Sequence, residues 1–256
     1  MRLARLATAS SPHDAASSPH DGAARWVRAE GAAWVPVEDP FLAFARGEDP
    51  AYLPGGTVTG DLLPPCEPLL VIGIAQNGPE HHSPVQAWLK SPRTVVASGT
   101  PVALRRDAGV PAIEGEIAVV IGKDTDGLTA ENAHEYVLGV TAVNDVSSPD
   151  RAVLDPRNFE GKGGAGYTPL GPWIDTDAGI DEVPMTVRID GVERVSTGTW
   201  DLPASIRECL VYVTHWLRLG PGDVIMTGAP RSNFSVEPGA FVEIEVAGMV
   251  LATQTG

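Results

Sequence analysis

Two glutamates stand directly before an apolar run near the middle of the chain. Glu114 and Glu116 are separated by one glycine and lead into the apolar residues 117–121. Because side chains alternate between the faces of a β-strand, both carboxylates should point to the same face. The apolar run predicts a buried strand, and neighbouring buried carboxylates repel one another and lose hydration. A hard divalent cation would relieve that cost. The alternative is an edge strand whose solvated face carries both glutamates.

The composition is that of a globular protein with a strongly acidic balance. The 256 residues are 43% hydrophobic and carry a net charge of −15, which argues against nucleic acid and anionic membrane surfaces as partners. We expect no membrane span and no secretory signal, since no apolar stretch approaches the roughly 18 residues that a span needs. Cys66 and Cys209 are far apart and form no metal-binding or redox spacing. They are interpreted as buried, reduced thiols, which predicts a cytoplasmic location.

The pattern of short apolar segments punctuated by Gly and Pro predicts a β-dominated α+β fold. Residues 1–65 are expected to form a small, strand-rich N-terminal extension, and residues 66–256 the main domain. A duplicated hexapeptide, Ala-Ser-Ser-Pro-His-Asp, predicts a mobile loop over about 9–22. Helices are expected at 40–45, 129–136 and 204–217. Strands are expected at 2–8, 25–37 (a hairpin), 69–74, 86–89, 94–96, 113–121, 138–143, 185–189, 192–195, 223–227 and 241–246.

Polar residues follow several of these predicted strands. His81 lies in the loop after the strand at 69–74, and a histidine there is a candidate general base. Asp145 follows the strand at 138–143, where it could supply a third carboxylate. The plain alternatives are a solvated loop histidine and an ordinary turn aspartate.

Lysine is scarce in this chain, which has only Lys90, Lys123 and Lys162. Lys162 lies in a glycine-rich loop whose backbone could approach a ligand closely, so this cation could meet an anionic substrate. A surface lysine in a flexible loop is the alternative. Residues 221–230 read as a turn, a strand and a glycine loop that could line a pocket.

Taken in order, these motifs resemble the catalytic C-terminal domain of the fumarylacetoacetate hydrolase family. The resemblance covers about residues 66–256 and rests on Glu-x-Glu before an apolar strand, Asn-Asp after the next strand, and Lys162 followed by Pro-Leu-Gly-Pro-Trp. It is completed by Pro-Gly-Asp-Val-Ile-x-Thr-Gly-x-Pro at 221–230. The resemblance implies a mixed β-sandwich roll and a homodimer.

The resemblance also implies roles for individual residues. Glu114, Glu116 and Asp145 would bind Mg²⁺, or alternatively Mn²⁺ or Ca²⁺. His81 and Lys162 would be the catalytic residues. His81 would act as the base, and Lys162 would hold the carboxylate or the leaving carbanion of a 2-oxo or 1,3-dicarbonyl acid that chelates the metal. The further substrate-binding candidates are Asn77, His82, Lys90, Arg151, Thr227 and Gly228.

The chain departs from the family pattern in the half of the site that would face the substrate. Gly78 replaces the tyrosine that usually precedes the histidine, and Pro149 replaces the arginine after Asn-Asp, for which Arg151 could substitute. Ala165 and Ala229 replace a common aspartate and threonine. Since the three carboxylates are retained, we interpret this pattern as an altered substrate.

The sequence is compatible with three functions. The first is metal-dependent hydrolysis of a carbon–carbon bond in an acylpyruvate-like acid. The second is decarboxylation or isomerisation of a 2-oxo acid at the same site, and the third is a non-catalytic ligand-binding homologue.

Overall fold

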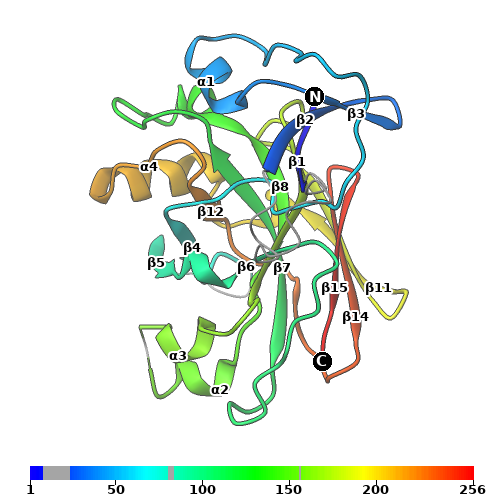
Figure 1. The fold of residues 1–256 in the computed structure, drawn as a ribbon. Coiled ribbons are helices and arrows are strands. Elements are labelled where there is room, and N and C mark those ends of the chain that lie inside the picture. Colours follow the sequence, from blue (N-terminus) through cyan, green and yellow to red (C-terminus); the bar gives the residue numbers. More distant parts are fainter. Residues whose placement is uncertain (8–23, 80–83, 156) are drawn as a thin grey trace.

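The computed structural model describes residues 1–7, 24–79, 84–155 and 157–256, and within them most of the regular structure is β (Figure 1). A large mixed sheet comprises β1 (Arg2–Ala7), β2 (Ala24–Glu30), β3 (Ala33–Pro36), β4 (Val71–Ala75), β5 (Gln86–Lys90), β6 (Val95–Ala97), β7 (Ala112–Ile121), β8 (Val137–Asn144), β9 (Thr168–Asp175), β12 (Val224–Met226) and β13 (Asn233–Ser235). A second, antiparallel sheet comprises β10 (Pro184–Ile189), β11 (Val192–Gly198), β14 (Phe241–Val246) and β15 (Met249–Gln254).

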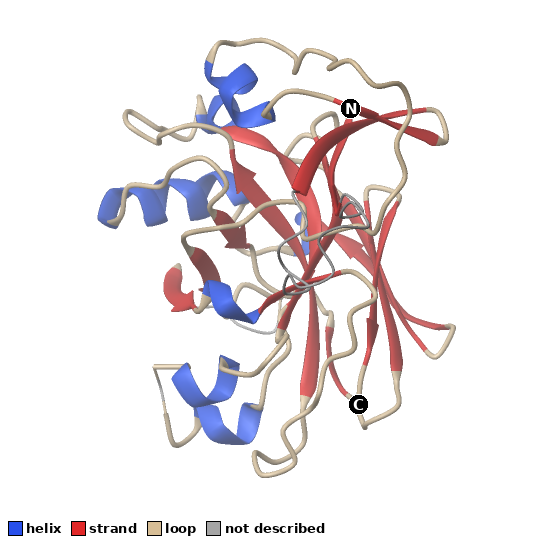
Figure 2. Ribbon diagram, viewed as in Figure 1, coloured by secondary structure: helices blue, strands red, loops and turns tan. Residues whose placement is uncertain are grey.

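The helices are few and short, and they lie around the periphery of the strands (Figure 2). They are α1 (Pro40–Ala45), α2 (Pro149–Ala152), α3 (Phe159–Lys162) and α4 (Ile206–Trp216), with 3-10 turns η1 (Pro92–Thr94), η2 (Ala133–Tyr136) and η3 (Thr199–Asp201). The prediction of a β-dominated α+β fold is therefore confirmed. None of these helices is long and apolar enough to cross a membrane.

Strand β7 separates two apolar environments, as its period-two pattern requires. One face carries Ile113, Ile117 and Val119 into the core that the large sheet shares with the second sheet. The other face, which carries both glutamates, continues with Ala118 and Val120 into a separate apolar cluster. The glutamates thus lie on a largely enclosed face, and the edge-strand alternative is wrong.

The second sheet packs closely against the glycine between the glutamates. A Cβ on Gly115 would lie 2.7 Å from Cγ2 of Val187 on β10 and 3.4 Å from Cγ1 of Ile244 on β14. Figure 1 shows β14 and β15 alongside β7. A side chain at Gly115 would force Val187 to shift, so the absence of a side chain here permits the close packing of the second sheet against β7.

Helix α4 confirms the prediction made from apolar spacing at 204–217. Ser205 caps it, since its hydroxyl accepts a hydrogen bond from the backbone N–H of Glu208, while the carboxylate of Glu208 accepts one from the N–H of Ser205. Its buried face, which includes Leu210 and Val213, packs into the core between the sheets.

The prediction of a helix at 129–136 is wrong, because only the 3-10 turn η2 forms there. The N–H of Thr129 donates to Oδ1 of Asn132 at 2.7 Å, and the N–H of Asn132 donates to the Thr129 hydroxyl at 3.4 Å. Such local side-chain bonds compete with a helix, and the chain passes directly from η2 into β8.

At the N-terminal end, β1 pairs with both β2 and β9, so the first strand joins the large sheet. The division near residue 65 stays a prediction. The loop expected at about 9–22 falls on positions outside the described residues.

Candidate metal and substrate site

Glu114 and Glu116 lie side by side on one face of β7, near its N-terminal end. Glu116 is only 3% exposed, and its Oε2 accepts a hydrogen bond from the backbone N–H of Gly228 at 2.7 Å. Oε1 of Glu114 accepts one from the Asn233 side chain at 2.6 Å. Both carboxylates are thus fixed by the segment that follows β12.

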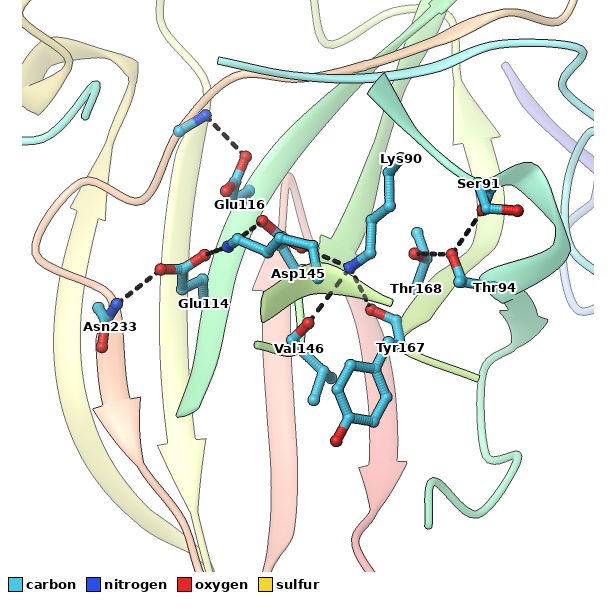
Figure 3. Close-up of polar contacts among 12 residues, drawn as sticks. Lys90, Ser91, Thr94, Glu114, Glu116, Asp145, Val146, Tyr167, Thr168 and Asn233 are labelled. Carbon is cyan, nitrogen blue, oxygen red and sulfur yellow. Dashed lines mark hydrogen bonds and ion pairs between the residues drawn. The ribbon is translucent and has the colours of Figure 1, made fainter. Parts of the chain in front are cut away.

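Asp145 joins the two glutamates because β8 pairs with β7. The backbone N–H of Asp145 donates to the carbonyl of Glu114 at 2.9 Å, directly after the paired residues Gly115 and Asn144. One oxygen from each of the three carboxylates lies within 4.8 Å of the others. The predicted acidic triad therefore converges on one point (Figure 3).

Two lysines approach the triad from other elements. Nζ of Lys162, at the end of α3, donates to Oδ2 of Asp145 at 2.6 Å and also contacts Glu114. Nζ of Lys90, at the end of β5, donates to Oδ1 of Asp145 at 2.5 Å and to the carbonyl of Tyr167 at 2.6 Å. Asp145 is thus held between two ammonium groups, and its contact with Lys90 can be followed in Figure 3.

The charges of the triad are not balanced by these lysines. Burial raises the pKa of Glu116 well above its ordinary value, and the neighbouring Asp145 and Glu114 raise it further. Burial acts on Asp145 in the same direction, but Lys162 and Lys90 outweigh it and lower its pKa to about 2. Three carboxylates face two ammonium groups, and no described cationic side chain pairs with Glu116. Either a proton on Glu116 or a further positive charge beside it would relieve this excess of negative charge.

The donor set fits a hard divalent cation. All three candidate ligands are carboxylates, which Mg²⁺, Mn²⁺ and Ca²⁺ prefer, and they come from rigid paired strands. Their mutual repulsion would fall when such an ion binds. Glu114, Glu116 and Asp145 are therefore the residues that would hold it.

The triad opens into a cavity of about 570 Å³, large enough for a small organic acid. Its described lining is largely polar on the side of the triad and comprises Ile74, Ala75, Gln76, Asn77, Gly78, Gln86, Trp88, Glu114, Glu116, Asp145, Ala152, Asn158, Lys162, Ala229, Arg231, Ser232 and Asn233.

Several other residues predicted for the site lie nearby but bond mainly to backbone. The Asn77 amide donates to the carbonyls of Thr227 at 2.8 Å and Ala204 at 2.9 Å, and so ties the end of β12 to the approach to α4. The Thr227 hydroxyl donates to the carbonyl of Ile117 at 2.7 Å. Roles for Asn77, Thr227 and Gly228 in substrate binding stay predictions.

Arg151 is placed differently from the other candidates. Its guanidinium pairs with Glu160, and it is not among the described residues that line the cavity. Its role in place of the missing family arginine stays a prediction. His81 and His82 fall outside the described residues.

Three further residues of this site were not predicted from the sequence: Asn233, Arg231 and Trp88. Trp88 lies two residues before Lys90 on β5, with its ring centroid 5.3 Å from Nζ of Lys162, so strand alternation could have grouped it with Lys90. Asn233 lies on the three-residue strand β13, within a segment that the sequence predicts to be a loop. Only its pairing with Glu114 brings it to the site.

The chain is similar to proteins that share this arrangement of strands. The sequence model of the Fumarylacetoacetate (FAA) hydrolase C-terminal family matches residues 70–255. A 5-carboxymethyl-2-hydroxymuconate delta-isomerase from Mycobacterium smegmatis superposes with a TM-score of 0.84 at 30% identity, over 100% of this chain and 99% of that one.

Curated relatives with named activities include both hydrolytic and non-hydrolytic enzymes. A 4-hydroxyphenylacetate degradation bifunctional isomerase/decarboxylase of Salmonella dublin is 34% identical over 73% of this chain and 40% of its own length. A maleylpyruvate hydrolase of Aquipseudomonas alcaligenes is 32% identical over 62% of this chain and 55% of its own length. This chain thus spans roughly half the length of these two relatives.

Together, the family match over most of the chain, the likeness to solved structures and the carboxylate triad on β7 and directly after β8 confirm the predicted resemblance. The chain belongs to the fumarylacetoacetate hydrolase family, whose members include hydrolases and isomerase/decarboxylases.

Proposed function

We propose that this protein is a Mg²⁺-dependent enzyme that hydrolyses a carbon–carbon bond in a 2-oxo or 1,3-dicarbonyl acid of the acylpyruvate type. Mn²⁺ or Ca²⁺ could replace Mg²⁺. The observation that carries the proposal is the excess negative charge of the triad, Glu114, Glu116 and Asp145, at the inner end of a cavity. A bound divalent cation supplies a Lewis acid for adjacent substrate oxygens.

Lys162 is suited to bind the carboxylate of such a substrate. Burial lowers the pKa of Lys162, but the charges of Asp145 and Glu114 outweigh burial and raise this pKa above its ordinary value. Lys162 is therefore an ammonium ion at neutral pH. A lysine that these carboxylates hold as an ammonium ion is suited to binding an anionic group. We therefore assign to Lys162 the binding and orientation of the substrate, and to His81 the activation of water.

Decarboxylation or isomerisation of a 2-oxo acid is the second candidate. It is supported by the isomerase/decarboxylase activity named for the Salmonella dublin relative and the isomerase activity named for the Mycobacterium smegmatis protein. These reactions need a stabilised enolate but no attacking water, so they should depend less on His81 than hydrolysis does.

The proposal is tested by turnover of an acylpyruvate, followed as loss of its ultraviolet absorbance. Glu116→Ala should abolish both Mg²⁺ binding and turnover, and activity that persists without metal would contradict the proposal. His81→Ala should then lower hydrolysis by roughly 100-fold or more, as expected when a general base is lost. Unchanged turnover in His81→Ala would favour the second candidate.

We also propose a cytoplasmic homodimer. Both cysteines are free and buried, which agrees with a reducing compartment. Leu89 on the edge strand β5 is 63% exposed and Trp216 on the neighbouring α4 is 74% exposed, and both line one apolar groove. Sedimentation should therefore give about twice the chain mass of 26.8 kDa, and a single-chain mass would contradict the dimer.

A further inference from the structure

Three residues that line the cavity, each on a separate loop, have a left-handed backbone conformation. Gln76, Asn158 and Arg231 have φ values of 55°, 62° and 60°. Among the described residues, the other two non-glycine cases, Asp190 and Ala247, lie in tight hairpin turns. A side chain held in this conformation away from a hairpin points to a functional position, and Arg231 is the charged member of the three.

Arg231 is placed by two anchored neighbours. Ser232 is fully buried, its hydroxyl donates to the carbonyl of Gly115 at 2.5 Å, and its own carbonyl accepts from the N–H of Gly115 at 3.0 Å. Asn233 pairs with Glu114 and hydrogen-bonds its carboxylate. The backbone from which Arg231 projects is therefore fixed to the strand that carries the metal triad.

The guanidinium of Arg231 has capacity left for a ligand. Its Nε lies 3.4 Å from Oδ1 of Asp201, and Oδ2 of the same carboxylate accepts a hydrogen bond from the Thr197 hydroxyl. No described residue pairs with the two terminal nitrogens. Asp201 thus orients one edge of the guanidinium. The two terminal nitrogens, which can bind a carboxylate in a bidentate manner, are left available for a ligand.

Arg231 and Lys162 differ in how deeply they lie in the cavity and in which residues they contact. The Lys162 side chain is 14% exposed, and its described ion pairs are to Glu114 and Asp145 of the triad. The Arg231 side chain is 56% exposed and contacts none of the three carboxylates in the described structure. Arg231 therefore lies at the mouth of the cavity and Lys162 at its inner, reactive end.

We infer that Arg231 selects dicarboxylic 2-oxo acids, by binding a second carboxylate at the end of the substrate opposite the 2-oxo group. This inference rests on the proposed function and adds to it the substrate class. Arg231 is a binding residue for the distal anion and takes no part in bond cleavage.

The test compares two five-carbon probes that differ in one group. 2-Oxoglutarate and 2-oxovalerate share the 2-oxo acid end, and one carries a distal carboxylate where the other has a methyl group. Calorimetric titration of the Mn²⁺-loaded protein should give at least roughly tenfold tighter binding of 2-oxoglutarate, as expected for a charge-assisted bidentate contact. Mn²⁺ affinity itself is measured in parallel for every variant.

Arg231→Gln should remove that preference without changing Mn²⁺ affinity. Binding of 2-oxoglutarate should weaken by roughly tenfold or more, whereas binding of 2-oxovalerate should stay within about twofold, which also shows that the site is intact. Arg231→Lys should retain part of the preference, since a lysine keeps the charge and loses the fork. Arg218→Gln, which removes an arginine paired with Asp124 and Asp126 away from the cavity, is the matched control.

The outcomes separate this inference from the proposal on which it rests. Equal binding of both acids by the unsubstituted protein, or a parallel loss of both in Arg231→Gln, would overturn the role of Arg231 while leaving a 2-oxo acid site. Failure of the Mn²⁺-loaded, unsubstituted protein to bind either acid would overturn the proposed function and this inference together.

Discussion

Nζ of Lys90 lies 2.5 Å from Oδ1 of Asp145, and both side chains are almost completely buried. Burial lowers the pKa of Lys90, while Asp145 acts in the opposite direction. The lysine also donates to the carbonyl of Tyr167, which lies just before β9. Lys90 therefore fixes the orientation of the Asp145 carboxylate, and it connects β5 to the residue before β9.

Lys90→Met should destabilise the fold, because it leaves the buried Asp145 with one cation fewer. Loss of one partner of a buried ion pair costs about 3–5 kcal/mol, measurable by urea unfolding with EDTA present. Lys123→Met is the control: Lys123 Nζ lies over the ring of Tyr136 at 4.7 Å, a contact worth about 1 kcal/mol or less. A Lys90→Met protein of unchanged stability but raised KM would instead favour the direct substrate contact that the sequence predicts.

Glu116→Gln should stabilise the metal-free protein. The pKa of Glu116 is raised in the folded state. Folding therefore becomes less favourable as the pH rises from the pKa of this carboxyl in the unfolded chain through its pKa in the folded protein. Replacing it with a neutral amide removes that cost, so urea unfolding at pH 8 in EDTA should give a higher free energy of unfolding for the substituted protein. The exposed Glu193→Gln should change nothing. With saturating Mn²⁺ the order should reverse, since the substituted protein loses a ligand, and no such reversal would count against a metal at Glu116.

Gly228→Ala should disrupt the site through the backbone. Gly228 has a φ of +102°, and an added Cβ would lie 2.5 Å from Cβ of Asn77, so we expect a loss of about 2 kcal/mol or more. Because the N–H of Gly228 bonds Glu116, Mn²⁺ affinity should fall as well. Gly239→Ala has nearly the same φ, +97°, with nothing within 4 Å of the added Cβ. It should show only the backbone cost, about 1 kcal/mol, and unchanged metal binding; equal effects of the two substitutions would contradict the steric argument.

Both thiols should make stability fall at alkaline pH. Burial raises the pKa of Cys66 and of Cys209 from 9.0 to about 12. Between these values the thiols ionise in the unfolded chain and stay protonated in the fold, so stability decreases as pH rises from 9 to 12. At pH 10 the loss is about 1.4 kcal/mol for each thiol. Urea unfolding of the Cys66→Ala/Cys209→Ala protein should lack this part of the pH dependence, and identical pH slopes would refute it.

Local patterns predicted most of the strands but missed β9, β13 and β15. Glu114 and Glu116 share a face because strand alternation is a local rule. Asp145 was a candidate third carboxylate beside the alternative of a turn aspartate, and the antiparallel pairing of β7 with β8 brings it to the two glutamates. Residues placed by long-range pairing could not be read in the same way. Asn233 reaches the site through a three-residue strand with no alternating pattern of its own.

The helix expected at 129–136 and the role of Lys90 show the same limit. Side-chain bonds of Thr129 and Asn132 replace helical bonds, although the composition of that segment permits a helix. Lys90 is one of three lysines, and scarcity marks it for attention, but only the folded arrangement shows that it contacts Asp145 and two backbone carbonyls.

The central claim is that Glu114, Glu116 and Asp145 hold one divalent cation in the cavity. Anomalous diffraction at the manganese edge, from crystals grown with Mn²⁺ and oxalate, tests it directly. We predict one manganese peak bonded to all three carboxylates and to oxalate, with the ion in the space between Glu116 and the other two carboxylates. Absence of manganese from the triad at saturating Mn²⁺, with Lys162 still bonded to both Glu114 and Asp145, would contradict the account.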